Sequence, residues 1–172
     1  MASELIVQTI QGPSSGANAN KVLIPSGHTL DVSGGTLVPN AGAVVQHVTS
    51  DITATASIST STTSWFDLTT VNITPRFNNS VMLIMFDWFI YSPVNSTAYL
   101  LLSEGANNNS IGGYYTQWVE SSRIDQHIHG HQHYQFNSTS PQTVKLRART
   151  DGSTHAFGGG RQGTLTVMEI KQ

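Results

Sequence analysis

Four of the chain's seven histidines occupy alternate positions of one short segment. In DQHIHGHQHYQF, residues 125–136, they stand at positions 127, 129, 131 and 133. Alternate residues of a β-strand point to the same face, so the four imidazoles would form a row. Imidazole binds transition metals, changes its charge at about pH 6.5, and makes ordinary polar contacts between subunits. The rest of the chain has to favour one of these three roles.

The candidate metal ligands are His127, His129, His131 and His133. Two imidazoles at positions i and i+2 of a strand can reach one metal ion, and imidazole suits Fe, Zn and Ni. Asp125 is the only carboxylate close by in the sequence, so one chain offers a partial set of ligands. Three copies around an axis would offer a complete set. A metal at a trimer axis, a metal-free interface and a pH-responsive surface all remain open.

The residues between the histidines indicate which way the row faces. The even-numbered positions of the same segment point to the opposite face and are the better candidates for the core. They include Ile124, Ile128, Tyr134 and Phe136. We therefore expect the histidines to point away from the core of their own domain, toward water or toward a neighbouring subunit.

The composition narrows the class of protein. Charged residues make up 10% of the chain, well below the usual quarter, and Ser, Thr, Asn and Gly are abundant, which is typical of β structure. The net charge is −2 and the eight Lys and Arg are scattered, so we expect no nucleic-acid partner. Cysteine is absent, which excludes disulfides. We expect neither a signal peptide nor insertion into a membrane, because no sufficiently long apolar run is present.

Alternating patterns predict an all-β fold. Strands are expected over residues 47–64, 65–74, 81–91, 98–105, 114–124, 125–136, 143–150 and 164–171. The run VMLIMFDWFIY, residues 81–91, predicts a central strand buried on both faces, in which Asp87 must be paired or lie at an interface. About eight strands separated by turn residues favour an antiparallel jelly-roll-like β-sandwich. We assign this head domain to residues 50–172.

The preceding segment, residues 1–49, has a different organisation. It contains two similar units, LIPSGHTL and LVPNAGAV, each with an apolar piece, a Pro-led turn and a second apolar piece. One copy cannot bury these apolar residues, whereas three intertwined copies can. We therefore predict a short intertwined β shaft and a homotrimer; the alternative is a loose meander on the head. The predicted trimerisation and anchor residues are Leu23, Ile24, Pro25, Leu30, Val32, Leu37, Val38 and Pro39.

Other constellations are weaker. Tyr114, Tyr115 and Trp118 are candidates for a sugar-binding surface, although such aromatics are often core residues. The Gly-rich segment DGSTHAFGGGRQG, residues 151–163, lacks the strand-to-helix setting of a phosphate site and is expected to be a surface loop. No paired general acid and base and no nucleophile motif is apparent, so we expect no enzymatic activity.

Several of these segments resemble a known family. The N-terminal region is similar to the N-terminal part of fibre-like virion proteins of tailed bacteriophages, notably marine and cyanobacterial phages. The similar segments are MASELIVQTIQG and the following NKVLIPSGHTLDVSGGTLVPNAG. Two later segments resemble the C-terminal domain of such proteins: STSTTSWFDLTTVNITPRFNNSVMLIMF and the closing GTLTVMEI. The likeness extends over most of the chain.

The resemblance implies a homotrimer with an intertwined N-terminal shaft or anchor and a β-sandwich head. It implies a virion protein, assembled in the host cytoplasm, with other tail or capsid proteins as partners and host surface glycan as the expected receptor of the head. The chain is short for a tail fibre and has no long repetitive shaft. A capsid decoration protein, a cement or head-fibre type, is therefore the alternative, and a carbohydrate-binding module is a more remote one.

Overall fold

The computed structural model describes residues 13–17, 22–28, 39–52, 58–119, 124–158 and 163–172. By its internal contacts the chain divides into two units, Met1–Val38 and Pro39–Gln172. The described residues contain strands and turns but no helix, and none of them forms a segment able to span a membrane as a helix.

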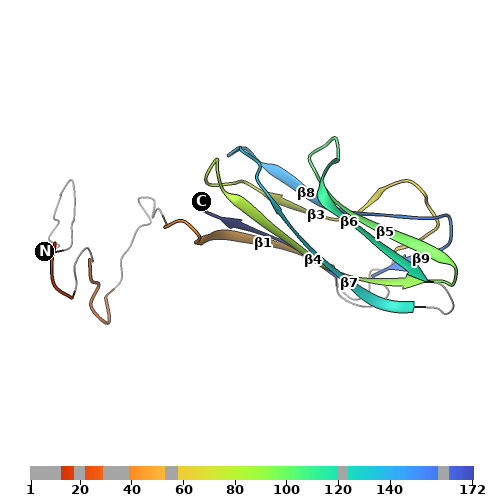
Figure 1. The fold of residues 1–172 in the computed structure, drawn as a ribbon, viewed down its shortest axis with the longest axis horizontal. Coiled ribbons are helices and arrows are strands. Elements are labelled where there is room, and N and C mark those ends of the chain that lie inside the picture. Colours follow the sequence, from red (N-terminus) through yellow and green to blue (C-terminus); the bar gives the residue numbers. More distant parts are fainter. Residues whose placement is uncertain (1–12, 18–21, 29–38, 53–57, 120–123, 159–162) are drawn as a thin grey trace, which may run out of the picture. The chain divides into compact units, whose positions relative to one another are not determined.

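Ten strands form the second unit within the described residues (Figure 1). They are β1 (Val44–Ile52), β2 (Ile58–Thr60), β3 (Phe66–Ile73), β4 (Val81–Ser92), β5 (Ser96–Glu104), β6 (Asn109–Val119), β7 (Ile124–Tyr134), β8 (Gln142–Thr150), β9 (His155–Phe157) and β10 (Gly163–Ile170).

The strands form two antiparallel sheets. In sheet A the long strands follow the order β1-β10-β4-β7, and the short β9 and β2 extend it beside the end of β4. Sheet B has the order β3-β8-β5-β6. This pair of four-stranded orders is that of an eight-stranded jelly roll. The predicted all-β sandwich is confirmed.

The core lies between the two sheets. Strand β4 alternates between buried even-numbered residues and half-exposed odd-numbered ones over most of its length, and β8 and β10 alternate in the same way. The largest core side chains that are fully buried include Trp88, Phe157, Met82, Ile84, Ile90, Leu100, Leu102, Leu146 and Leu165. Apolar burial of this kind is the main stabilising contribution to the sandwich.

The boundary between the two units differs from the predicted one at residues 49 and 50. Strand β1 pairs with β10 from Val44 to Ile52, so most of it would have been assigned to the shaft. Gly42 N–H also donates to the carbonyl of Lys171 at 2.7 Å, and Lys171 Nζ donates to the carbonyl of Pro39 at 2.6 Å. These hydrogen bonds make residues from Pro39 onward part of the head.

The two sequence units of the N-terminal region each contain a glycine turn. His28 N–H donates to the Pro25 carbonyl at 3.1 Å, and Ala43 N–H donates to the Asn40 carbonyl at 3.2 Å. The third residue of each turn, Gly27 or Gly42, has a φ of 81° or 84°. A non-glycine residue is strained there, which explains why both units place glycine at that position.

The predicted shaft residues are only partly within the described residues. Of these, Leu23 and Ile24 are exposed by 59% and 43%, and Pro25 is exposed as well; the neighbouring Val22 is exposed by 55%. Four other predicted shaft residues, Leu30, Val32, Leu37 and Val38, lie outside the described residues. Trimerisation through this segment stays a prediction.

One buried carboxylate joins the last strand to the turn before β4. Glu169 is fully buried and accepts hydrogen bonds from Arg76 N–H at 2.8 Å, Phe77 N–H at 3.0 Å and Gln46 Nε2 at 2.6 Å. Burial by itself would raise the pKa of Glu169, but these hydrogen bonds hold it below its ordinary value of 4.5.

We predict that Glu169→Gln lowers the free energy of unfolding at pH 7 by about 1–3 kcal/mol, because the amide carries no charge and has fewer acceptor sites for these donors. The folded-state pKa is depressed, so this stabilisation is present above the unfolded pKa and is lost as the pH falls through the folded one. Urea unfolding followed by tryptophan fluorescence over an acid pH series measures both effects. Equal stability of Glu169→Gln and wild type would contradict the prediction.

Candidate functional site: the histidine row on sheet A

The four histidines of β7 form a row on the outer face of sheet A. Strand β7 pairs with β4 along its whole length, and within the described residues it pairs with no other strand of the sheet. The register places His127, His129, His131 and His133 opposite Phe89, Asp87, Met85 and Leu83. Cross-strand partners share a face. The row therefore lies beside the outward side chains of β4.

The inner side of β7 packs on the core, as predicted. Ile128, Tyr134 and Phe136 contact the buried cluster between the sheets. The side chain of Ile124 lies outside the described part of the chain. The predicted direction of the histidines, away from the core of their own domain, is confirmed by this packing.

Gly130 lies on the inner side of β7, between the apolar residues Ile128 and Tyr134, and the structure shows why no side chain stands there. A Cβ atom at this position would lie 2.4 Å from a ring carbon of Phe86 and 2.4 Å from one of Tyr115. These two rings meet edge to face with centroids 4.8 Å apart. Any larger side chain would push them apart, so glycine lets β7 approach both rings closely.

The aromatic residues proposed for sugar binding are only partly described. The ring of Tyr115 packs against Phe86, and its hydroxyl donates to the carbonyl of His131 at 3.0 Å. Burial raises the pKa of Tyr115 above its ordinary value. Here Tyr115 links β6 to β7. The side chains of Tyr114 and Trp118 lie outside the described residues, and sugar binding stays a prediction.

Asp87 is paired with the histidine row. His127 Nδ1 lies 2.6 Å from Asp87 Oδ1, and His129 Nδ1 lies 3.5 Å from Asp87 Oδ2. An ionised carboxylate only accepts hydrogen bonds, so the Nδ1–H of His127 donates to it. This leaves Nε2 of His127 available to another ligand. Asp87 lies on the outer face at the side of β4, which explains an acid within such an apolar run.

The exposure of the row increases along β7. His127 is half-buried and packs edge to face against Phe89 with ring centroids 5.4 Å apart, whereas His129, His131 and His133 are exposed. Within the described residues, no group of three or more His, Asp or Glu side chains is placed to hold a metal ion. A metal on this row would need histidines from more than one copy of the chain.

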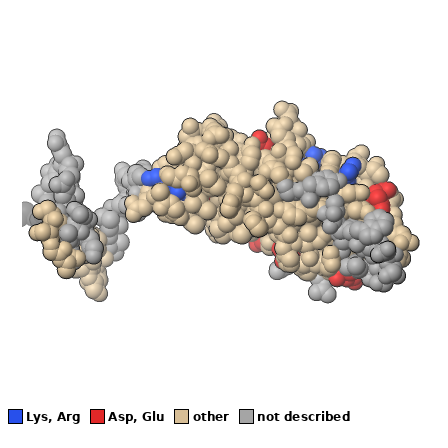
Figure 2. Space-filling view, in the orientation of Figure 1, with Lys and Arg blue, Asp and Glu red and all other residues tan. Residues whose placement is uncertain are grey.

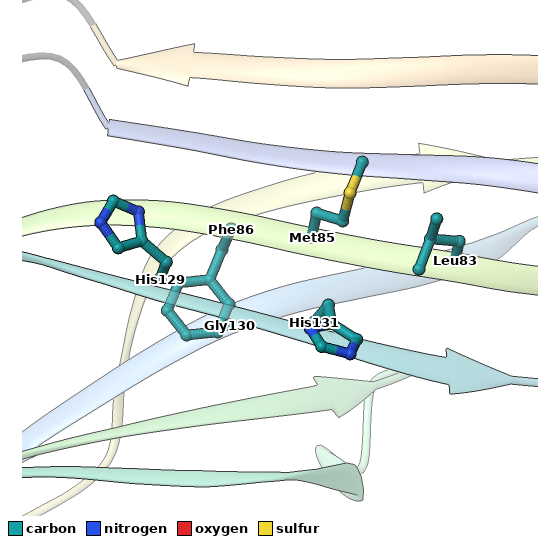
Figure 3. A pocket seen from close by; sticks show the side chains of 6 residues that line it. All are labelled: Leu83, Met85, Phe86, His129, Gly130 and His131. Atoms are coloured by element: carbon teal, nitrogen blue, oxygen red, sulfur yellow. The ribbon is translucent and has the colours of Figure 1, made fainter.

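A shallow hollow lies between β4 and β7, beside the row (Figure 3). Its volume is ≈ 470 Å³, and its lining residues are Leu83, Met85, Phe86, His129, Gly130 and His131. The lining is mostly apolar, with the two histidines from β7 at one side. Such a hollow can take an apolar side chain of another molecule.

The outer face of sheet B carries an ionic cluster that the sequence analysis missed. Asp67 accepts from Lys145 Nζ at 2.9 Å and from Arg147 Nε at 2.8 Å. Burial would raise the pKa of Asp67, but these two cations lower it below its ordinary value. The guanidinium of Arg149 lies over the rings of Trp65 and Tyr99, 5.1 Å and 4.6 Å from their centroids. The sequence contains a signal for this cluster, because Lys145, Arg147 and Arg149 stand at alternate positions and therefore share one face of a strand.

Comparison with known proteins gives matches at the level of structure alone. No protein-family model matches the chain, and no curated protein sequence matches it. Two solved structures from infectious bursal disease virus, the Gx strain and the VP2 subviral particle, match 85% and 93% of the chain with TM-scores of 0.42 and 0.41 and identities of 15% and 17%. Dimeric latent PorU from Porphyromonas gingivalis matches 77% with a TM-score of 0.44 and 13% identity.

The chain spans less than half of each of these matched chains: 42% and 46% of the two viral chains and 14% of PorU. The similarity is low, and the assignment of the jelly roll rests on the strand pairing described above.

We predict that Fe, Zn or Ni is retained only by the assembled protein, at about one ion per three chains, since one copy does not bring three ligands together. Elemental analysis combined with light scattering, before and after strong chelation, measures the ratio. His129→Ala with His131→Ala should remove the metal. A metal-free assembly would make the row a plain interface or solvent face, and one ion bound to each isolated chain would contradict the prediction.

Proposed function

We propose that the chain is a non-enzymatic structural protein of a virion, a trimeric short tail fibre or spike that presents a β-sandwich head. One observation carries the proposal most directly. Val22, Leu23 and Ile24 are 43–59% exposed in a unit separate from the head. Three consecutive exposed aliphatic side chains favour burial by other chains over a free monomer. The resemblance of the surrounding sequence to phage fibre-like proteins supports the same conclusion.

In this proposal the N-terminal unit assembles the trimer and attaches it to other tail or capsid proteins. Its apolar pieces gain a core only when three copies intertwine, so that folding of the shaft and assembly are coupled. The chain has no cysteine, and its robustness comes from this interlocking and from the jelly-roll core. Assembly takes place in the host cytoplasm and the mature protein is part of the virion.

The head would contact the host surface, with glycan as the expected class of receptor. Neutral polar and aromatic side chains are typical of glycan contacts, and charged side chains are few on the face that Figure 2 shows. Two cations of sheet B, Lys145 and Arg147, are already paired with Asp67. This distribution disfavours nucleic acid as a partner.

A capsid decoration protein is the alternative. In that role the N-terminal unit would clamp neighbouring capsid subunits, and the head would project from the capsid. A carbohydrate-binding module remains a more remote alternative, since it explains the sandwich but not the repeated N-terminal units.

We predict that deleting residues 1–38 converts a stable trimer into a monomer or a weak oligomer while the head stays folded. The deletion ends before Pro39, so that β1 and its pairing with β10 remain intact. Sedimentation equilibrium gives the oligomeric state, and circular dichroism checks the fold. A fully stable trimer of the shortened chain would overturn the proposed role of the N-terminal unit.

Counting copies per virion separates the two virion roles. We expect tens of copies, the number appropriate to fibres, in purified particles analysed by quantitative mass spectrometry. Hundreds of copies would favour the decoration protein. Absence from purified particles would contradict both roles.

A further inference from the structure

Strand β4 is apolar on both sides, but on the outer side one chain buries Phe89 and leaves the residues before it half-exposed. Its even-numbered residues from Met82 to Trp88 are buried between the sheets, whereas Leu83, Met85 and Asp87 on the other side are half-exposed. A continuous apolar run is typical of a strand buried on both faces. The outer side of β4 therefore has the composition of a covered surface.

The neighbouring strand β10 continues this pattern. Its outward residues are Thr164, Thr166, Met168 and Ile170, all half-exposed. Met168 lies opposite Leu83 and Thr166 lies opposite Met85 in the register with β4. The two central strands of sheet A thus present a joint apolar strip containing Leu83, Met85, Met168 and Ile170.

The two outer faces of the sandwich differ in chemistry. On sheet B, Lys145, Arg147 and Arg149 of β8 are outward and make ion pairs or stack on aromatic rings. The described outward residues of β1, β10, β4 and β7 in sheet A include no Lys or Arg. A charged, paired face is typical of contact with water, and an apolar face with few charges is typical of an interface.

Polar side chains flank the apolar strip on both sides. The histidine row lies along β7, and β1 contributes His47, Thr49 and Asp51, all exposed. An apolar centre with a polar rim is the usual anatomy of a protein–protein interface. The hollow beside His129 and His131 adds a site where an apolar side chain of a partner can insert (Figure 3).

The face is large enough for a stable contact. Strand β4 has 12 residues, which corresponds to roughly 40 Å at about 3.3 Å per residue, and four strands about 4.8 Å apart span roughly 19 Å. Because the neighbouring strands are shorter, the face measures about 600–750 Å². This area is close to the roughly 800 Å² that each partner buries in a standard interface.

We propose that the outer face of sheet A, formed by β1, β10, β4 and β7, is the contact surface between copies of this chain. The face contains its own complementary groups: imidazoles at His47, His129, His131 and His133, and carboxylates at Asp51 and Asp87. When the same face of every copy lies toward a common rotation axis, one copy can supply the imidazole of a hydrogen-bonded pair and the next copy the carboxylate. The inference rests on the homo-oligomer of the proposed function. It adds that contacts between the heads stabilise this oligomer together with the N-terminal units.

Methionine oxidation tests the face in the full-length protein. Met85 and Met168 are half-exposed on the face, and Met82, which is 0% exposed in the core, is the internal reference. We expect hydrogen peroxide to oxidise Met85 and Met168 at least about tenfold more slowly in the assembled protein than after dilution to free copies. The reason is that only dissociated chains expose the two side chains, so the oxidation rate is proportional to the dissociated fraction. Peptide mass spectrometry measures each rate.

A matched pair of variants tests the energetic role. Met85→Glu with Met168→Glu should raise the dissociation constant of the full-length assembly at least about thirtyfold, the effect of losing one interface hot spot. Leu101→Glu makes the same kind of change at an outward position of sheet B, opposite Arg147, and should leave the dissociation constant unchanged. Circular dichroism verifies that all variants fold.

The outcomes separate the inference from the proposed function. Protection of both methionines together with a weakened Glu variant supports the inference, and a dimer in place of a trimer supports it while contradicting the proposed trimer. An assembled wild type in which Met85 and Met168 oxidise at the free rate, or whose Glu variant assembles normally, overturns the inference and leaves the virion role intact. A wild type that is monomeric at all concentrations overturns both.

Discussion

The arrangement of the head depends on one buried carboxylate. Glu169 lies on the inward side of β10 beside Leu165 and Val167, a position that in this strand is otherwise apolar. A buried charge is costly unless donors surround it, and here two backbone N–H groups and Gln46 do so. The turn before β4 is therefore held on β10, where Glu169 is opposite Met82. This contact stands at one end of the β10–β4 ladder, and β4 in turn pairs Asp87 with His129.

This contact also relates two sequence motifs that are far apart in the chain. The segment ITPRFNNS, residues 73–80, supplies the donors, and the closing GTLTVMEI, residues 163–170, supplies the carboxylate. The two motifs form one structural unit: a tight turn whose N–H groups need an acceptor, and a strand that delivers it.

Alternation along the strands made most of the head predictable. The inward residues of β8 are Val144, Leu146 and Ala148, as their spacing predicts, and the direction of the histidine row followed from Ile128 and Tyr134. Side-chain parity is a local property, so that it can be derived from the sequence. The same alternation contained Glu169, but its partners come from a turn about 90 residues away, and no local pattern indicates them.

Other features were beyond local reasoning for similar reasons. Strand β9, His155–Phe157, lies in a Gly-rich segment expected to be a loop, and it exists because it pairs with β2 and the end of β4. The start of the head at Pro39 depends on hydrogen bonds to Lys171. The cation cluster at Asp67 depends on the pairing of β3 with β8. Each of these is a long-range contact.

The junction at Pro39 has a mechanical consequence. The N-terminal segment enters the head at β1, which is bound to β10 by an antiparallel ladder from Val44 to Ile52. When the N-terminal unit is held and the far end of the sandwich is pulled, the load acts along β1. The hydrogen bonds of the ladder are then strained together, in shear, and rupture requires that many break at once. A head attached in this way resists a force directed along β1. It is weaker against a force that pulls the start of β1 sideways, because such a force breaks the hydrogen bonds one after another.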